Sequence, residues 1–181
     1  MKPTLLTATA LILTLTAAFA VDEAAKKEQE PFDITVIQKR IEEAGIPTPA
    51  VVQQLEAKAN ALAKEGKWQE AADTYDMLAK SADWLANLIY AGIEPFYEAS
   101  YDDRKNYPIK DSDLKLENQS NYYKTKRNEA MIYQAECYVR LNDTKRAIPL
   151  LVRGLELIHL TEMELWARAR KDLYLLIQVT E

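Results

Sequence analysis

Apolar residues recur every three or four positions along most of the chain after residue 33, which is the spacing of an amphipathic helix. Strand-like alternation of apolar and polar residues is rare, and the chain has only four glycines. The pattern therefore predicts an all-α protein of about seven helices. Because each helix has one apolar side, we expect antiparallel helical hairpins that bury these sides against one another.

Local signals mark the helix ends. Asp33 can cap a helix that Gly45 closes, and Thr48 followed by Pro49 favours the start of the next one. Thr161 followed by Glu164 fits a capping box. Pro95 predicts a kink or break near Gly92. The expected helices cover 33–45, 48–65, 68–80, a stretch after Ser81, 120–141, 144–159 and a last segment from Thr161.

A polar segment interrupts the helical periodicity near the middle of the chain. Between Tyr101 and Asn121 charged residues and a proline replace the apolar stripe. We expect a surface loop inserted around residues 102–119. Loops of more than about 15 residues in a compact domain are often functional or disordered.

One helix–turn–helix pattern occurs twice, 76 residues apart (Gly66 to Asn142). Its first copy consists of residues at helical spacing on either side of a turn, namely Leu55, Ala59, Leu62, Gly66, Trp68, Ala71, Tyr75 and Leu78. The register returns at Met131, Ala135, Tyr138, Asn142, Thr144, Ala147, Leu151 and Gly154. Small residues allow two antiparallel helices to approach closely, and asparagine tolerates the left-handed conformation that glycine supplies at the turn.

The pattern resembles the tetratricopeptide repeat, a helix–turn–helix unit of about 34 residues. The resemblance implies a short solenoid of stacked hairpins in a domain spanning residues 33–181, with a concave face that binds other proteins. An unrelated bundle of alanine-rich hairpins is the alternative, because such hairpins also carry small residues at helical spacing.

In the resembled family, ligands lie on the concave face, which is lined by the first helix of each pair. Mapped onto this sequence, that face consists of Gln53, Glu56, Asn60, Lys64, Glu129, Ile132, Glu136 and Arg140. Some family members clamp a terminal carboxylate with lysine and asparagine, and Asn60 matches such an asparagine. Glu56 replaces the expected basic residue, so a mixed or basic peptide segment is the expected ligand.

Tyrosines concentrate in the middle of the chain, where eight of the ten lie between Tyr90 and Tyr138. Tyrosine combines a large contact area with a hydroxyl for hydrogen bonding, so it is common at binding surfaces. The alternative is that these rings pack between the middle helices. Four of them flank the expected loop and are harder to bury, namely Tyr101, Tyr107, Tyr122 and Tyr123.

The first 20 residues have the composition of a secretory signal peptide. Lys2 precedes an apolar stretch over residues 5–19, and Ala18-Phe19-Ala20 resembles a cleavage site. We expect cleavage after Ala20, a flexible mature N-terminus over 21–32 and no stable membrane insertion. An uncleaved membrane anchor is the alternative. The short signal and the low cysteine content are typical of a bacterial protein that is periplasmic or secreted.

Charge and residue counts narrow the function. The chain has a net charge of −5, and loss of residues 1–20 leaves 22 basic and 28 acidic residues, a net of −6. This balance argues against nucleic acid as a partner. Cys137 and His159 are the only cysteine and histidine, too few for a zinc site or a histidine-based triad. We expect a buried Cys137 and no enzyme activity, cofactor or metal.

The sequence therefore predicts a non-catalytic scaffold or adaptor of the bacterial periplasm or cell envelope that binds a partner protein. One alternative is a homodimeric structural subunit of an envelope complex. Another is a module that binds a glycan or peptide through a tyrosine groove. The last helix distinguishes the first two, because burial of Trp166 and Leu173 by their own chain would cap the stack without a second copy.

Overall fold

A computed structural model of the chain describes residues 41, 43–93, 99–106, 109–159 and 161–179. The expected signal peptide (1–20), the segment 21–32, most of the helix expected over 33–45, and Tyr107 lie outside the described residues. The chain divides into two units, residues 1–46 and 47–181. In the first unit, Gly45 has a φ of 66° and the Ile46 N–H donates to the Ile41 carbonyl, as expected for a glycine that ends a helix.

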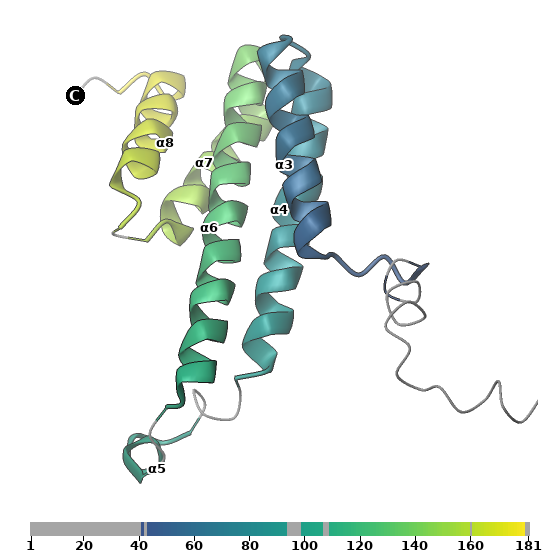
Figure 1. Cartoon of the computed structure of the whole chain (residues 1–181). Helices are drawn as coiled ribbons and strands as arrows, with labels where there is room; N and C mark the ends of the chain where they lie inside the picture. The colour runs from purple at the N-terminus through teal and green to yellow at the C-terminus, as the bar shows by residue number, and fades with distance from the viewer. Residues whose placement is uncertain (1–40, 42, 94–98, 107–108, 160, 180–181) are drawn as a thin grey trace, which may run out of the picture. The chain divides into compact units, whose positions relative to one another are not determined.

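The second unit is built from helices (Figure 1). They are α3 (Pro49–Lys64), α4 (Trp68–Ala91), α5 (Tyr101–Asn106), α6 (Asp111–Arg140), α7 (Thr144–Leu157) and α8 (Met163–Leu176). None of the described residues lies in a strand, so the all-α prediction is confirmed for this part of the chain. The total of about seven helices stays a prediction. Among the described helices, none is both long and apolar enough to cross a lipid bilayer.

The start of α3 follows the sequence signals. Thr48 is the N-cap, and its side-chain oxygen accepts a hydrogen bond from the Val51 N–H at 3.4 Å. Pro49 occupies the first helical position, where the N–H that proline lacks would have no partner within the helix. The prediction of this helix start is confirmed.

The two predicted turns share one hydrogen-bonding pattern. Gly66 has a φ of 74° and Asn142 a φ of 60°, so both are left-handed as expected. After Gly66 the Lys67 N–H donates to the Leu62 carbonyl at 3.0 Å, and after Asn142 the Asp143 N–H donates to the Tyr138 carbonyl at 2.8 Å. These are the same bonds of a Schellman motif, shifted by the 76-residue offset.

The helix after the first turn is longer than expected. The sequence suggested one helix over 68–80 and another after Ser81, but α4 runs without a break to Ala91 and ends before Gly92. This correction has a local reason, because no glycine or proline lies within the segment. It also has a tertiary reason, because Ala79, Ala82, Leu85 and Ala86 continue the buried face of the helix.

The surface loop expected over 102–119 is also corrected. Tyr101–Asn106 forms the short helix α5, and α6 begins at Asp111, about two and a half turns before the expected start near Ser120. Asp111 and Asp113 lie in the first turn of α6, where the helix dipole favours acidic side chains. Ser120 is fully buried, and its hydroxyl donates to the Ala86 carbonyl of α4 at 3.0 Å.

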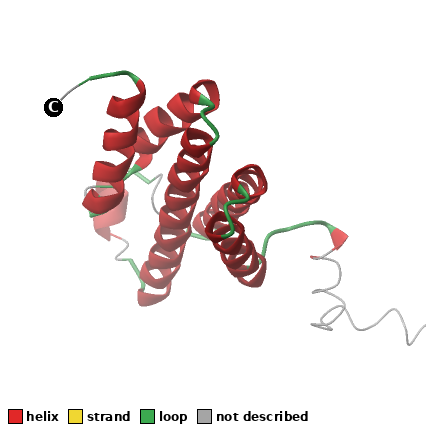
Figure 2. Cartoon of the chain, turned by 90° about the horizontal axis from the view of Figure 1, so that it is seen from above, coloured by secondary structure: helices red, strands yellow, loops and turns green. Residues whose placement is uncertain are grey.

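Apart from the short helix α5, each helix packs mainly on the next one along the chain. α3 packs on α4, α4 runs along α6, α6 packs on α7, and α8 rests on α7 and α6. Viewed from above, α8 and the α3/α4 pair lie on opposite sides of α6 (Figure 2). A first core cluster joins α3, α4, α6 and α7 through small residues and Tyr75, Leu78 and Tyr138.

A second core cluster lies between α6, α7 and α8. Its buried members are Ile132, Ala135, Leu151, Leu165 and Ala169. A Cβ atom added at Gly154 would collide with the Ile132 side chain, so α7 lies as close to α6 as a glycine allows. Leu173 packs against this cluster, whereas Trp166 is only half-buried, so α8 is held by its own chain through Leu165, Ala169 and Leu173.

The end of α7 and the start of α8 are joined by a buried amide. Asn128 of α6 donates to the Leu157 carbonyl at 3.1 Å and to Glu162 Oε2 at 3.4 Å. Glu162, rather than Thr161, is the N-cap of α8, and no side chain caps this helix. The predicted capping box of Thr161 and Glu164 is therefore wrong, because α8 begins later than its sequence signal.

Candidate binding groove

Six of the predicted site residues line one open cavity of about 550 Å³, which we call the groove. They are Glu56, Asn60 and Lys64 from α3 and Glu129, Glu136 and Arg140 from α6. The groove is completed by Ala63, Trp68, Tyr75, Lys126, Tyr133, Cys137 and Arg168. Side chains from α3, α4, α6 and α8 therefore meet at one surface.

The floor of the groove is a tyrosine pair. The Tyr75 hydroxyl donates to Asn60 Oδ1 at 2.7 Å, and the Tyr75 and Tyr133 rings are tilted by 59° with centroids 5.6 Å apart. Burial raises the pKa of Tyr75 to about 12. Cys137 is 3% exposed, as predicted, and burial raises the pKa of its thiol to about 11. Because the thiolate is the nucleophilic form of cysteine, the raised pKa disfavours reaction of Cys137 near neutral pH.

The wall between α3 and α6 is an ion-pair cluster. Lys126 Nζ lies 2.8 Å from Glu56 Oε1 and 3.0 Å from Glu129 Oε2. Partial burial acts to lower the pKa of Lys126, but the hydrogen bonds from Glu56 and Glu129 outweigh it and leave that pKa raised. The ammonium group of Lys126 therefore forms ion pairs with two carboxylates.

The wall formed by α8 is held by a bidentate pair. Arg168 Nη2 lies 2.7 Å and 2.8 Å from the two oxygens of Glu136, and Arg168 Nε donates to Glu136 Oε1 at 3.1 Å. The guanidinium also lies 5.1 Å from the centroid of the Tyr133 ring. Burial raises the pKa of Glu136, and Arg168 opposes this shift.

One end of the groove carries cations that are not paired in this way. Lys64 and Arg140 lie in the last turns of α3 and α6, and the Arg140 guanidinium is 5.9 Å from the Trp68 ring centroid. A second cavity of about 600 Å³ continues from Arg140 and Arg168 to Lys171 and Asp172 of α8. We call Lys64, Arg140 and Lys171 the cationic end; none of the three forms an ion pair with a described carboxylate.

The remaining predicted site residues lie elsewhere. Ile132 is 0% exposed because α7 and α8 cover it, so its assignment to the surface is wrong. Gln53 is exposed on α3 but does not line the groove. Tyr101 is 76% exposed on α5, and Tyr107 lies outside the described residues.

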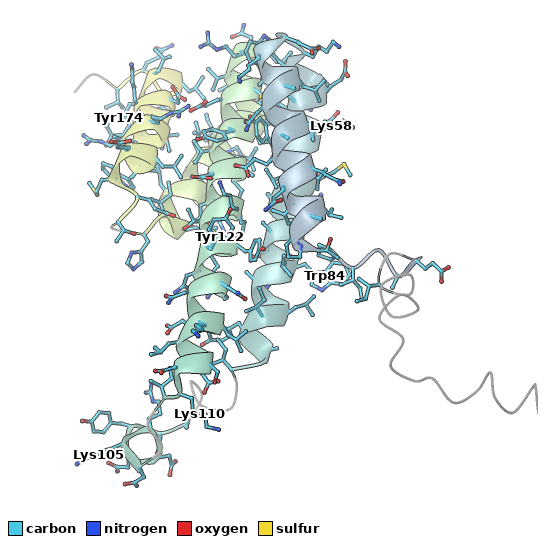
Figure 3. The ribbon with its side chains drawn as sticks, in the orientation of Figure 1. Lys58, Trp84, Lys105, Lys110, Tyr122 and Tyr174 are labelled. Carbon is cyan, nitrogen blue, oxygen red and sulfur yellow. The ribbon has the colours of Figure 1, made fainter. Side chains whose placement is uncertain are left out.

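Tyr122 and Tyr123 have different environments although they are adjacent. Tyr122 is exposed one turn before Lys126, whose Nζ is 5.7 Å from the ring centroid, so it extends the groove face of α6 (Figure 3). Tyr123 packs against the first core cluster and meets Tyr122 edge to face at 5.1 Å. The binding role predicted for the tyrosines stays a prediction, and Tyr122 lies beside the groove without lining it.

Sequence reasoning missed four side chains that shape the groove. Lys126 and Tyr133 share helical spacing with Glu129, Glu136 and Arg140, so the period of α6 could have revealed them. Tyr75 belongs to the repeat pattern, and its hydroxyl reaches the groove through Asn60. Arg168 comes from a helix with no repeat equivalent, so no local signal marked it.

In comparisons with known proteins, no family model, curated protein or solved structure matches this chain. Within the described residues, no three histidine, cysteine, aspartate or glutamate side chains are grouped so as to hold a metal ion.

Proposed function

We propose that this protein is a non-catalytic binding protein whose groove takes a segment of a partner protein. The observation that carries the proposal is that six residues converge on one open cavity. Three come from α3 and three from α6, and Lys64 and Glu129 are the two that lie nearest in sequence between the helices. A cavity of about 550 Å³ lies within the range of about 300–1,000 Å³ typical of ligand sites.

The repeat pattern supports the same proposal. The equivalent turns at Gly66 and Asn142 are consistent with two tetratricopeptide-like hairpins, α3 with α4 and α6 with α7, followed by α8. In such a stack the first helices of the hairpins form the binding face, which here would be α3, α6 and α8.

The chemistry of the groove favours binding over catalysis. The three glutamates of the groove are engaged by Lys126 and Arg168, and the Cys137 thiol is held neutral. Aromatic rings and paired charges of this kind suit recognition of a polypeptide, because they combine contact area with fixed hydrogen-bonding groups.

Export is part of the proposal. We propose that a signal peptide is cleaved after Ala20 and that the protein works in the periplasm or outside the cell. Mass spectrometry of the protein from its native source should then give an N-terminus at Val21. An intact N-terminus in a membrane fraction would contradict this.

The groove is tested by co-purification of partners with residues 21–181 from a native envelope fraction. The test variant is Lys64→Glu/Arg140→Glu, and the control is Lys58→Glu/Lys145→Glu, which changes two exposed cations outside the groove. A partner retained by the wild type and the control but lost by the test variant supports the proposal. A partner that binds all three proteins equally would place the binding surface elsewhere.

The outer face of α8 favours a second candidate, a homodimer. Met163 and Ile177 are 55% and 45% exposed, and between them the Arg170 guanidinium lies 5.2 Å from the Trp166 ring centroid and 5.0 Å from that of Tyr174. Light scattering would detect a dimer. Its loss in Met163→Glu/Ile177→Glu would place the interface on α8, whereas a monomeric wild type would contradict this candidate.

A further inference from the structure

We propose that the segment bound by the groove is acidic and that its carboxylates lie against Lys64, Arg140 and Lys171. This inference rests on the proposed function and names the chemistry of the partner. It replaces the mixed or basic ligand expected from Glu56.

Glu56 is not available to attract a basic residue. Its carboxylate is held by Lys126 at 2.8 Å, and the same ammonium holds Glu129 at 3.0 Å. A basic ligand would have to break this cluster, in which Lys126 and Glu56 have side chains only 18% and 31% exposed. Because partly buried charges lose more by separation than exposed ones, the cluster is expected to stay intact.

Glu136 is engaged in the same way. Both of its oxygens accept hydrogen bonds from Arg168, which also lies over Tyr133. Once these two clusters are formed, the carboxylates that line the groove are all paired with basic groups of the protein itself. The groove therefore offers a ligand no strong site for a lysine or arginine.

The side chains of the cationic end remain open to a ligand. Lys64 and Arg140 line the groove, and Arg140 and Lys171 line the adjoining cavity, so the three positions flank one continuous surface. Asp172 lines the adjoining cavity together with Arg140 and Lys171. Burial raises its pKa, and Arg168, Lys171 and Arg140 oppose that shift.

A competing role for Lys64 and Arg140 is favourable interaction with helix dipoles, because both lie in last turns. That interaction does not occupy their hydrogen-bond donors. Five cations and four carboxylates line the two cavities together, a local net charge of +1 in a chain whose overall net charge is −5. An acidic segment therefore meets opposite charge at this surface.

The aromatic rings beside these cations indicate which residues of the ligand lie next to its acidic residues. Trp68 lies under Arg140 and Tyr133 lies under Arg168. Both rings are partly exposed and line the groove, so they can contact apolar side chains of the ligand. We infer a segment in which aspartate or glutamate alternates with apolar residues.

The test is selection of binders from a displayed library of random twelve-residue peptides on residues 21–181. Selected peptides are then made with a fluorescent label, and their affinity is measured by anisotropy. The test variant is Lys64→Gln/Arg140→Gln/Lys171→Gln. The control is Lys58→Gln/Lys105→Gln/Lys145→Gln, which removes the same charge from exposed positions that line neither cavity. Figure 3 labels Lys58 on α3 and Lys105 on α5.

We expect the selected peptides to be enriched in aspartate and glutamate. Their affinity should fall at least tenfold in the test variant, stay within twofold in the control, and decrease as salt is raised. A further variant, Ala63→Gln, adds a longer neutral side chain to the groove wall and should weaken every groove ligand whatever its charge. Circular dichroism and thermal unfolding establish that each variant is folded.

The other outcomes separate the two proposals. Neutral or basic peptides that are weakened by Ala63→Gln would overturn the acidic ligand while leaving the groove as the binding site. Peptides unaffected by Ala63→Gln and by the test variant, or a failure to select any peptide, would overturn both.

Discussion

The hydroxyl of Tyr75 on α4 donates a 2.7 Å hydrogen bond to the side-chain oxygen of Asn60 on α3, at the floor of the groove. The bond links the two helices of the first hairpin, and Tyr75 is 4% exposed. The packing of the hairpin and the shape of the groove therefore depend on the same contact.

Replacing Tyr75 by phenylalanine should reduce the free energy of unfolding by about 0.5–1.5 kcal/mol, because one buried hydrogen bond is lost while the ring is kept. Urea unfolding measures the change. Tyr101→Phe is the control, since Tyr101 is 76% exposed, and it should leave stability unchanged. Equal effects of the two substitutions would show that the Tyr75–Asn60 bond contributes nothing.

The stability of the protein should fall between pH 10 and pH 12. Folded Tyr75 keeps its proton up to a pKa of about 12, whereas the unfolded chain loses it near 10. The resulting stabilisation is complete below pH 10 and disappears as the pH rises to 12. It amounts to about 3 kcal/mol for a rise of the pKa from 10 to about 12.

Denaturation measured at several alkaline pH values tests this. Cys137 and Tyr133 also have raised pKa values and contribute with the same sign, so the wild type loses stability from several groups. Tyr75→Phe should lose less stability between pH 10 and 12 than the wild type does. Parallel curves for the two proteins would rule out a perturbed Tyr75.

Gly154→Ala should destabilise the junction of α6 and α7. The new methyl group collides with the Ile132 side chain, which is fully buried. Overpacking costs about 1–3 kcal/mol, whereas replacing glycine by alanine within a helix gains at most about 1 kcal/mol, so we expect a net loss of stability. Ile132→Val removes the colliding methyl group.

A double-mutant cycle with urea unfolding measures this coupling. Ile132→Val alone should cost about 0.5–1.5 kcal/mol, but in the Gly154→Ala background it should cost less or restore stability. Strict additivity of the two substitutions would contradict the close approach.

Asn142 should tolerate glycine but not alanine. Its φ of 60° is left-handed, a conformation that costs most residues with a Cβ atom roughly 1–2 kcal/mol. Asn142→Ala is therefore expected to lower the melting temperature, and Asn142→Gly to leave it unchanged or raise it slightly. Gly66→Ala at the equivalent turn should match Asn142→Ala in direction. Wild-type stability of the Asn142→Ala variant would contradict a left-handed conformation at residue 142.

Arg168→Met should destabilise the protein more at pH 7 than at pH 4. Burial raises the pKa of Glu136 and Arg168 opposes this, so loss of Arg168 raises that pKa further. A carboxyl group whose pKa is raised by folding stabilises the folded state when the pH is below the ordinary pKa of the group. This stabilisation is lost as the pH rises through the raised pKa. The Arg168 side chain is 53% exposed, so we expect a loss of about 0.5–1 kcal/mol at pH 7.

Arg153→Met provides the control. Arg153 pairs with Glu156 within α7, and both side chains are more than half exposed, so its removal should have almost no effect at either pH. If Arg153→Met and Arg168→Met show the same pH dependence, the pair between α6 and α8 is not what stabilises the groove wall.

The sequence predicted correctly those features that depend on residues within a single helix or turn. Thr48 and Pro49 start α3, and Gly66 and Asn142 occupy left-handed turns, because capping and turn preferences act over a few residues. The groove faces of α3 and α6 were also predictable in part. Asn60 and Lys64, like Glu136 and Arg140, are four residues apart and so lie on one side of a helix.

The tertiary structure decided which faces are covered and which charges are paired. Ile132 and Glu56 hold equivalent positions in the two hairpins, yet α7 and α8 bury Ile132 while Lys126, 70 residues away, neutralises Glu56. The polar start of α6 is helical partly because α4 continues beside it and accepts the hydrogen bond of Ser120. Such contacts depend on how distant helices dock. Periodicity within one helix determines what its faces are made of, and only packing determines what each face meets.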